Sequence, residues 1–551
     1  MWQIENILNT DKYSSQEILD LLRNKSNIHQ LFLDFDPIKA TEDTRFLTKY
    51  FVQELHTHFA KEEKTNLPLE LFSRIYSPFL YYLIAHVYWR FSFNLISKKI
   101  EIYSSSSATT IESIACLPQT SEEFFKNIFS NKDLRLLIDL IILNKEIEAV
   151  KWTPLQPKVQ PSQESNLKDK IINLINSVLP FKGVYGFSIY ENIFLSAILV
   201  LKSFTLKSKK AITSREAVED LNIEIYDPSL IQSIRTAISI LLPPEFRTIF
   251  SRRKKFSFKN ILRAPIIFDT VRLYYSDQVI NYVAQQTHGL RICFAQHGGC
   301  YATFKNRLIP ESIEFLCDTF FMWGDMLPHS NSCKSIKYAP SPMLSKVALK
   351  EPVLSKDIIF VGTDISPYWD AIVHPNPYHL GSYLQEKYNF LSNISSENFS
   401  TTFYKLYPAP ISQDFNEEKF IKDLFPQLKL LNKSYHLEEK IAAAKIFVID
   451  SIESTTFYKC MAANQPAICY NGLVFFELTD HAKQIYEELK EAKIVFETAV
   501  EAAEFLNSKT ECINKWWDST EVQMARKRFC DSYARTDKNY LWQWVKTLLK
   551  L

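Results

Sequence analysis

Residues 296–301, which read Q-H-G-G-C-Y, are the first group whose types and spacing suit chemistry at a ligand site. They follow the apolar run 291–295, which predicts a buried strand. Two adjacent glycines after a strand allow backbone N–H groups to point at a ligand, and a neighbouring histidine can hydrogen-bond a phosphate or an acceptor hydroxyl. An equally open interpretation is a tight turn whose histidine serves the structure alone. The predicted catalytic residue is His297, and the other predicted cleft residues are Gln296, Gly298, Gly299 and Tyr301.

A pair of carboxylates, Glu311 and Glu314, follows this turn. Their spacing places both on one face of a helix that they are expected to open. Paired carboxylates supply a general base toward an acceptor hydroxyl, or a nucleophile where the configuration of a sugar is retained. Carboxylates at a helix start also complement the helix dipole, which is the structural alternative. We therefore predict Glu311 and Glu314 as catalytic candidates beside His297.

A hydroxyl-rich turn at residues 450–456 follows a second apolar run, 445–449. Hydroxyls and the first N–H groups of a helix bind phosphate through hydrogen bonds and the helix dipole. Ordinary N-capping explains the same composition and is the alternative. At the end of another expected strand, 403–407, a lysine can bind a diphosphate or simply remain solvated. The predicted donor-binding residues are Lys405, Tyr407, Asp450, Ser454, Thr455 and Thr456.

The composition of the 551-residue chain excludes several classes of nucleotide-binding protein. It contains only 9 glycines, and neither the G-x-G-x-x-G fingerprint nor the G-x-x-x-x-G-K-[ST] phosphate loop occurs. The net charge of +2 gives no global field that attracts nucleic acid, so no nucleic-acid partner is expected. The 9 cysteines include no C-x-x-C pair, which argues against a zinc ribbon and against a disulfide framework.

Strands and helices must bring these groups to one cleft. Apolar positions at helical spacing over 14–150 indicate that the segment 1–165 is mainly helical. Beyond it, short apolar runs alternate with helical segments, which predicts the parallel sheets of an α/β fold. The expected strands are 184–189, 264–268, 291–295, 319–323, 357–361, 403–407, 445–449 and 467–470.

A proline-marked stretch, 338–352, divides the alternation into two Rossmann-like halves. The expected first domain is 1–345, with its Rossmann-like part at 180–345, and the second Rossmann-like domain is 346–518. The C-terminal helices, 519–551, are expected to cross back to the first domain. Such halves bind ligands at the carboxyl ends of their strands, in the cleft between them.

The first six residues form neither a basic nor an apolar signal region, so a cytoplasmic location is expected. No segment reaches the ~20 uninterrupted apolar residues that a membrane-spanning helix needs. We expect peripheral contact with the inner face of the cytoplasmic membrane instead, through the basic run 252–255 and the aromatic stretch 81–89.

Taken in order, these motifs resemble those of a bacterial family of transferases from surface-carbohydrate (O-antigen) gene clusters. The resemblance rests on the Q-H-G-G-x-Y turn, the E-x-x-E pair, Asp318 and the W-G strand 321–324. It continues in residues 74–80, 406–408, 450–456, 464–466 and 516–530, and it covers 70–545. Two positions depart from the family pattern: Ala302 stands where the family tends to have glycine, and Asp325 where it has an aromatic residue.

The resemblance implies a GT-B glycosyltransferase, in which two Rossmann-like domains face a cleft. The first half would bind the acceptor and the second half a nucleotide-activated donor, with no cofactor and no metal. The second half also resembles, more distantly, transferases that use CMP-activated sugars and carry a K-x-H-P motif. Lys405 and Pro408 match that motif, while Tyr407 stands in place of its histidine.

The implied partners are a nucleotide sugar, with a CMP-linked Kdo-like or nonulosonic acid as the candidate, and a glycan or lipid-linked glycan acceptor. That acceptor would belong to lipopolysaccharide, O-antigen or capsule. Two alternatives stay open. One is a polyol-phosphate transferase that uses a CDP-polyol, and the other is a non-catalytic assembly factor of the same pathway.

Overall fold

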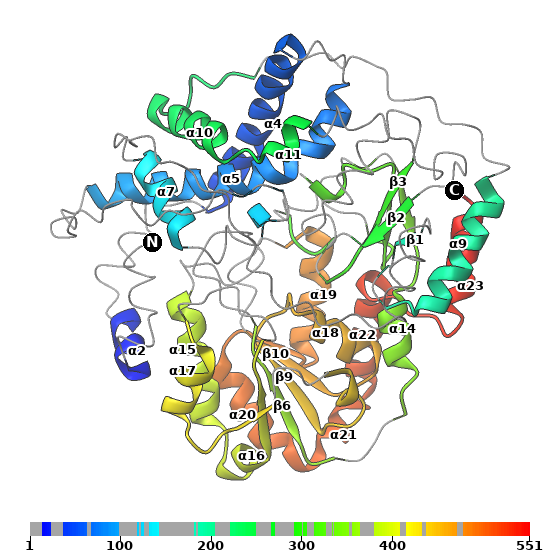
Figure 1. Cartoon of the computed structure of the whole chain (residues 1–551). Coiled ribbons are helices and arrows are strands. Elements are labelled where there is room, and N and C mark those ends of the chain that lie inside the picture. Colours follow the sequence, from blue (N-terminus) through cyan, green and yellow to red (C-terminus); the bar gives the residue numbers. More distant parts are fainter. Residues whose placement is uncertain are drawn as a thin grey trace, which may run out of the picture.

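The computed structural model contains two parallel β-sheets, each accompanied by helices (Figure 1). This confirms the α/β class expected from the alternating pattern. The structure describes residues 14–23, 37–62, 68–98, 118, 120, 123–125, 132–142, 181–182, 184, 186–203, 221–248, 266–269, 291–299, 301–305, 313–326, 333, 335–351, 355–363, 380–407, 415–431, 437–470 and 478–551.

The first sheet has five parallel strands in chain order, β1-β2-β3-β4-β5. They are β1 (Phe181–Lys182), β2 (Ile266–Asp269), β3 (Ile292–Ala295), β4 (Thr319–Met322) and β5 (Ile336–Tyr338). Every residue of β3 and β4 is buried, which is why these strands read as continuous runs without polar alternation. The strand expected over 184–189 is wrong. The described residues there form a turn into α9 (Ile189–Ser203), because Gly186 has a φ of 97° and the backbone of Met343 packs where a side chain would project.

The second sheet has six parallel strands in the order β11-β10-β9-β6-β7-β8. They are β6 (Ile358–Val361), β7 (Thr402–Lys405), β8 (Lys429–Leu431), β9 (Ile446–Ile449), β10 (Ala467–Tyr470) and β11 (Val495–Phe496). This is the order of a doubly wound Rossmann sheet, whose first and fourth strands lie side by side at the centre. Here those strands are β6 and β9, and Val361 pairs with Ile449. Ligands of such sheets bind outside the carboxyl ends of this central pair.

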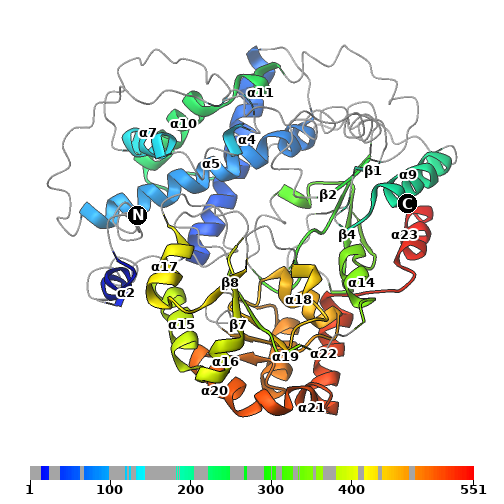
Figure 2. The same cartoon turned by 60° about the horizontal axis from the view of Figure 1, so that its bottom comes forward.

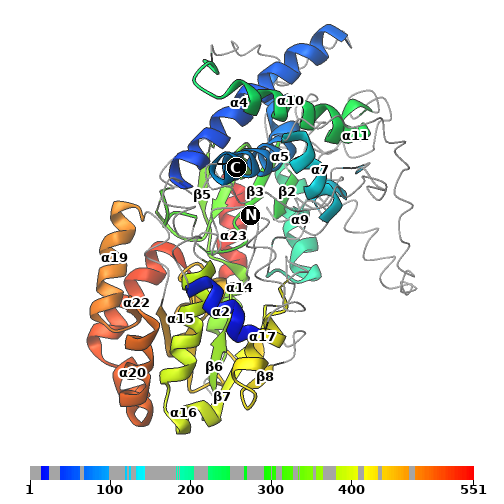
Figure 3. The same cartoon turned by 90° about the vertical axis from the view of Figure 1, so that its left-hand side faces the viewer.

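Helices α4 and α10 lie at the top of Figure 3, away from the second sheet, whereas α2 packs against α15 and α17 and α14 packs against α18 of the second half. Those described before the second sheet are α2 (Ser15–Arg23), α4 (Pro37–Glu62), α5 (Leu69–Lys98), α7 (Lys132–Ile142), α9, α10 (Pro228–Leu241), α11 (Pro244–Thr248) and α14 (Pro342–Ala348). Those that follow β6 are α15 (Leu380–Asn393), α16 (Ser396–Thr401), α17 (Glu417–Leu424), α18 (Thr455–Ala462), α19 (Asp480–Glu491), α20 (Ala499–Lys509), α21 (Ile513–Trp517), α22 (Thr520–Tyr533) and α23 (Tyr540–Leu549), with 3-10 turns at Leu437–Glu439 and Thr510–Cys512.

Helix α5 is a core helix that packs against α4, α7 and α10. The aromatic stretch 81–89 lies in its middle and is buried apart from the half-buried Tyr88. The expected membrane contact through 81–89 is therefore wrong, because a helix that is apolar all round serves here as the centre of a helical layer. The basic run 252–255 lies outside the described residues. In the part of the chain that the structure describes, no helix combines the length and the apolar character needed to cross a bilayer.

The last helix, α23, packs beside α9 on the first sheet (Figure 2). Trp544 is buried in the same apolar cluster as Ile267 and Phe321, and its indole N–H donates to the carbonyl of Pro340 at 2.9 Å. The preceding helix, α22, packs instead against α18 and α19 of the second half. The C-terminal segment therefore contacts both halves of the chain.

Candidate active site

The Q-H-G-G turn leaves the carboxyl end of β3 and is shaped by Gln296. The Gln296 side-chain amide donates to the carbonyl of Gly298 at 2.7 Å, and its oxygen accepts from the Trp323 N–H at 3.0 Å. The nitrogen and the oxygen of this amide both form hydrogen bonds inside the protein, and the residue is 3% exposed. Gln296 therefore fixes the turn against the end of β4. It supports the site in this way, and its contact with a ligand stays a prediction.

His297 is oriented by Tyr301 across the same turn. The Tyr301 hydroxyl lies 2.7 Å from His297 Nδ1, and Tyr301 itself is buried. The tautomer decides which of the two atoms donates this bond. A half-buried histidine that is engaged at Nδ1 would act on a substrate through Nε2.

The two glycines allow the first half to touch the second half. A Cβ added to Gly298 would lie 3.4 Å from Thr455 Oγ1, and one added to Gly299 would lie 2.4 Å from the ring of Tyr458. Both partners belong to α18, which follows the hydroxyl-rich turn. The two motifs singled out in the sequence therefore lie against each other.

We expect Gly299→Ala to destabilise the protein by about 1–3 kcal/mol, because the new methyl group overlaps the buried Tyr458 ring. Gly298→Ala is the matched control, since its methyl group would meet Thr455 at ordinary contact distance. Urea unfolding of both variants measures the difference. Equal stability of the two variants would contradict the close approach of the turn to α18.

The hydroxyl-rich turn begins α18. The Ser454 side chain accepts a hydrogen bond from the Thr456 N–H at 3.3 Å, so Ser454 is the N-cap of this helix. Ser454 and Thr455 are half-buried, whereas Thr456 is 8% exposed. The structure thus supports N-capping and leaves Ser454 and Thr455 as the members of the turn with exposed surface.

Asp450 is fully buried at the carboxyl end of β9. Its carboxylate accepts from the Thr363 N–H at 3.0 Å, from Thr363 Oγ1 at 2.8 Å and from the Tyr383 hydroxyl at 2.6 Å. These bonds tie the end of β9 to the end of β6, which is the central crossover point of the sheet. With 0% exposure Asp450 supports the strand ends from within, and its direct contact with a donor stays a prediction.

Lys387 from α15 completes this buried network. Its ammonium lies 2.7 Å from Glu417 Oε1 and 3.3 Å from Asp450 Oδ2, and its side chain has no exposed surface. Burial alone lowers the pKa of Lys387, but the two carboxylates outweigh it, so its pKa is raised and the residue is charged. The Tyr404 hydroxyl also donates to Glu417 at 2.6 Å. The network therefore fixes the ends of β6, β7 and β9 together.

The predicted donor residues of β7 lie at the same edge of the sheet. Lys405 is the last residue of β7 and is 2% exposed, and burial lowers the pKa of its ammonium group. Tyr407 follows it and is half-buried. The strand ends thus place Lys405, Tyr407 and the 450–456 turn along one edge, as expected for parallel strands.

Of the predicted carboxylate pair, the structure describes Glu314. Glu314 is 2% exposed and lies with Ile313 in a helical turn, and a turn at Phe315 and bends at 316–318 then lead into the amino end of β4. Since β3 and β4 are parallel, this segment enters the sheet at the edge opposite to the one from which the His297 turn leaves. Glu311 lies outside the described residues.

Several residues that carried the family resemblance are structural. Arg74 of α5 forms ion pairs with Glu70 at 2.6 Å and with Asp318 at 3.4 Å, and Asp318 also accepts from the Ile292 N–H at 2.9 Å. Asn464 has a φ of 53° and accepts at its side-chain oxygen from the Trp517 indole at 3.0 Å. These contacts hold the amino edges of the two sheets, away from the candidate site.

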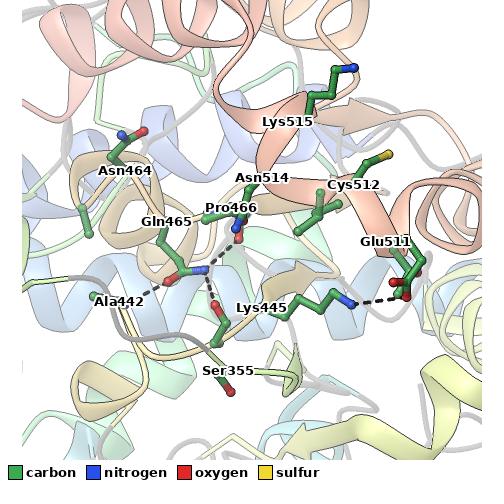
Figure 4. Close-up of a pocket in the computed structure, with 14 residues that line it drawn as sticks. Ser355, Ala442, Lys445, Asn464, Gln465, Pro466, Glu511, Cys512, Asn514 and Lys515 are labelled. Carbon is green, nitrogen blue, oxygen red and sulfur yellow. Dashed lines mark hydrogen bonds and ion pairs between the residues drawn. The ribbon is translucent and has the colours of Figure 1, made fainter.

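A cavity of about 400 Å³ also lies at the amino edge of the second sheet (Figure 4). Lys445 and Pro466, which precede β9 and β10, are among its lining residues. The buried amide of Gln465 in its wall accepts from the Ala442 N–H at 2.9 Å and donates to the Ala444 carbonyl at 2.9 Å. The Gln465 amide is engaged with the protein itself, and the cavity lies at the edge opposite to Ser454.

Sequence reasoning missed Thr363 and Lys387. Thr363 follows β6 and Gly362, so a search of every strand end for hydroxyls and glycines would have found it. Lys387 has no such signal, because a lysine within a helical pattern is usually solvated.

A comparison with protein-family models identifies the chain. The model described as LIC12162 family transferase matches residues 21–548, so the chain belongs to this family of transferases. The match confirms the expected transferase class. No curated protein matches the chain.

Proposed function

We propose that the chain is a glycosyltransferase of GT-B type that moves a sugar from a nucleotide-activated donor to a glycan acceptor. The observation that supports it most is the meeting of the two motifs, in which Gly298 lies against Thr455 at the carboxyl ends of two parallel sheets. A donor bound at the second sheet would then face groups supplied by the first sheet.

The second half is proposed to bind the nucleotide. Thr363 and Asp450 follow its central strands β6 and β9, at the edge where doubly wound sheets bind ligands. Ser454 Oγ accepts the capping bond and retains its hydroxyl hydrogen for a phosphate oxygen. Lys405 and Tyr407 would contribute from β7, and CMP is the proposed nucleotide.

The first half is proposed to supply catalysis. The acceptor oxygen forms a bond to the anomeric carbon, the bond from that carbon to the phosphate oxygen breaks, and its electron pair leaves with the nucleotide. The acceptor proton passes to a general base, for which His297 is favoured because it lies at the carboxyl edge beside α18. Glu311 and Glu314 remain proposed as base or nucleophile. No metal is needed if His297 and the turn at Ser454 stabilise the developing charge.

The proposed acceptor is a lipopolysaccharide, O-antigen or capsule glycan. A glycan carried on a lipid would be met at the inner face of the cytoplasmic membrane, which requires peripheral contact with that surface.

Nucleotide binding is tested by a thermal-shift screen against CMP, CDP, UDP, GDP and dTDP, because a ligand that binds only the folded state raises its stability. Ser454→Ala should then weaken binding of the nucleotide that stabilises the protein in this screen. The expected loss is about 1–3 kcal/mol, because a hydrogen bond to a charged group is removed. Ser395→Ala is the matched control, since Ser395 caps α16 by the same bond, to the Asn398 N–H at 3.2 Å. Both variants should lose similar cap stability, and equal nucleotide affinity in both would refute the assignment.

A further inference from the structure

The outward face of α9 is apolar along its whole length. Its exposed side chains are Tyr190, Ile193, Phe194, Ala197 and Leu201, with Tyr190 80% and Leu201 65% exposed. Their spacing keeps them on one side of the helix, opposite the buried Leu195 and Leu199. A surface helix normally carries charged residues on this side. Helix α9 therefore presents two apolar faces, and among the described residues the first sheet and α23 cover one of them.

Helix α23 adds aromatic and basic groups beside this stripe. The two helices lie side by side at the right-hand edge of Figures 1 and 2 and share one buried cluster. The exposed side chains of α23 are Trp542, Lys546 and Leu549, and the exposed Lys538 and Lys550 flank the helix. The single carboxylate of α9, Glu191, forms an ion pair with Lys346 at 2.7 Å. The exposed charges of the pair are thus lysines.

We propose that this α9–α23 face docks on the surface of an anionic lipid bilayer. Tyrosine and tryptophan favour the boundary between headgroups and acyl chains, and aliphatic side chains on the same face enter the outer part of the apolar layer. Lysines at the rim bind anionic headgroups while their stems lie along apolar surface. A second copy of the chain fits less well, because a two-fold contact would bring the lysines of two α23 helices together without exposed carboxylates on either helix to offset them.

The position of α9 relates this surface to the candidate site. Helix α9 follows the turn after β1, and β1 is parallel to β3, so its first residues lie at the carboxyl edge of the sheet where His297 also lies. Docking through α9 would hold that edge near the bilayer. The inference deepens the acceptor part of the proposed function, and it replaces the contact expected through the buried stretch 81–89.

The test is flotation of the full chain with vesicles of phosphatidylcholine alone or with one-third phosphatidylglycerol, in the absence of donor. We expect the protein to float with anionic vesicles at low salt and less at high salt. The triple variant Tyr190→Ser, Phe194→Ser and Leu201→Ser should lose at least ~10-fold in partitioning, because its apolar contact is removed. Lys546→Gln with Lys550→Gln should weaken binding to anionic vesicles only.

The matched control is Ile225→Ser with Met524→Ser, which removes side chains 72% and 67% exposed outside the α9–α23 face. It should float like the parent chain. Tyr190→Ser alone tests the same face if the triple variant fails to fold. Absence of flotation by the parent chain, or equal flotation by the α9 variants, would overturn the proposal. A lipid-free dimer in sedimentation that the α9 changes dissociate would overturn it in favour of a second copy. Since no donor is present, failure here is separate from failure of sugar transfer.

Discussion

His297→Asn is expected to lower turnover by at least ~10²-fold while leaving nucleotide affinity nearly unchanged. The physical reason is that general acid–base groups contribute about 10²–10⁴-fold, and His297 is a titratable group in the turn that the first half packs against α18. Asparagine keeps a polar side chain of smaller size, so the turn held by Gln296 should persist. The measurement is release of nucleotide from the donor that the ligand screen identifies, with calorimetric affinity for the nucleotide measured in parallel.

Tyr301→Phe is the companion variant, because it removes only the hydroxyl at 2.7 Å from His297 Nδ1. Tyr301 is a positioning residue, so its loss should reduce turnover less than loss of His297 and should shift the pH profile of turnover. Glu311→Gln and Glu314→Gln distinguish the carboxylates. A loss of similar size in either one would assign the base or nucleophile to it. Normal turnover in all three variants would place catalysis on other residues, whereas absence of turnover by the parent chain itself would favour a non-catalytic assembly factor.

The sequence predicted the strand ends of the candidate site well. Buried parallel strands read as uninterrupted apolar runs, so the residues that follow β3 and β9 were recognisable as Q-H-G-G and as a hydroxyl-rich turn. Two adjacent glycines in a chain with 9 also indicated a close approach. In the structure, the group that approaches Gly299 is the ring of Tyr458 from the second half.

The roles of individual residues were less predictable, because they depend on partners far along the chain. From the sequence, Asp450 was predicted to bind the donor. In the structure its carboxylate accepts hydrogen bonds from Thr363 and Tyr383. Glu314 was expected near the start of a helix, and the helical turn that contains it ends before Phe315. No local spacing encodes such contacts, since tertiary packing alone decides which carboxylate is buried.

Lys387→Met is expected to lower the free energy of unfolding by about 3–5 kcal/mol, because removal of one partner leaves buried carboxylates without compensation. Glu417 and Asp450 both lose a cation, at 2.7 and 3.3 Å. Lys422→Met is the matched control on the neighbouring helix. Its partner Glu418 lies 2.9 Å away and both side chains are largely exposed, so the cost should stay below ~1 kcal/mol. Urea unfolding of both variants gives the comparison.

The double variant Lys387→Met with Glu417→Gln separates the network from simple loss of packing. Removing one carboxylate should recover part of the lost stability, since fewer buried charges remain unpaired. In variants that fold, nucleotide affinity should also fall, because Asp450 would no longer be held where it fixes Thr363 at the end of β6. A Lys387→Met protein as stable as Lys422→Met would show that the network does not hold these strand ends, and the proposed nucleotide site would lose its rigid base.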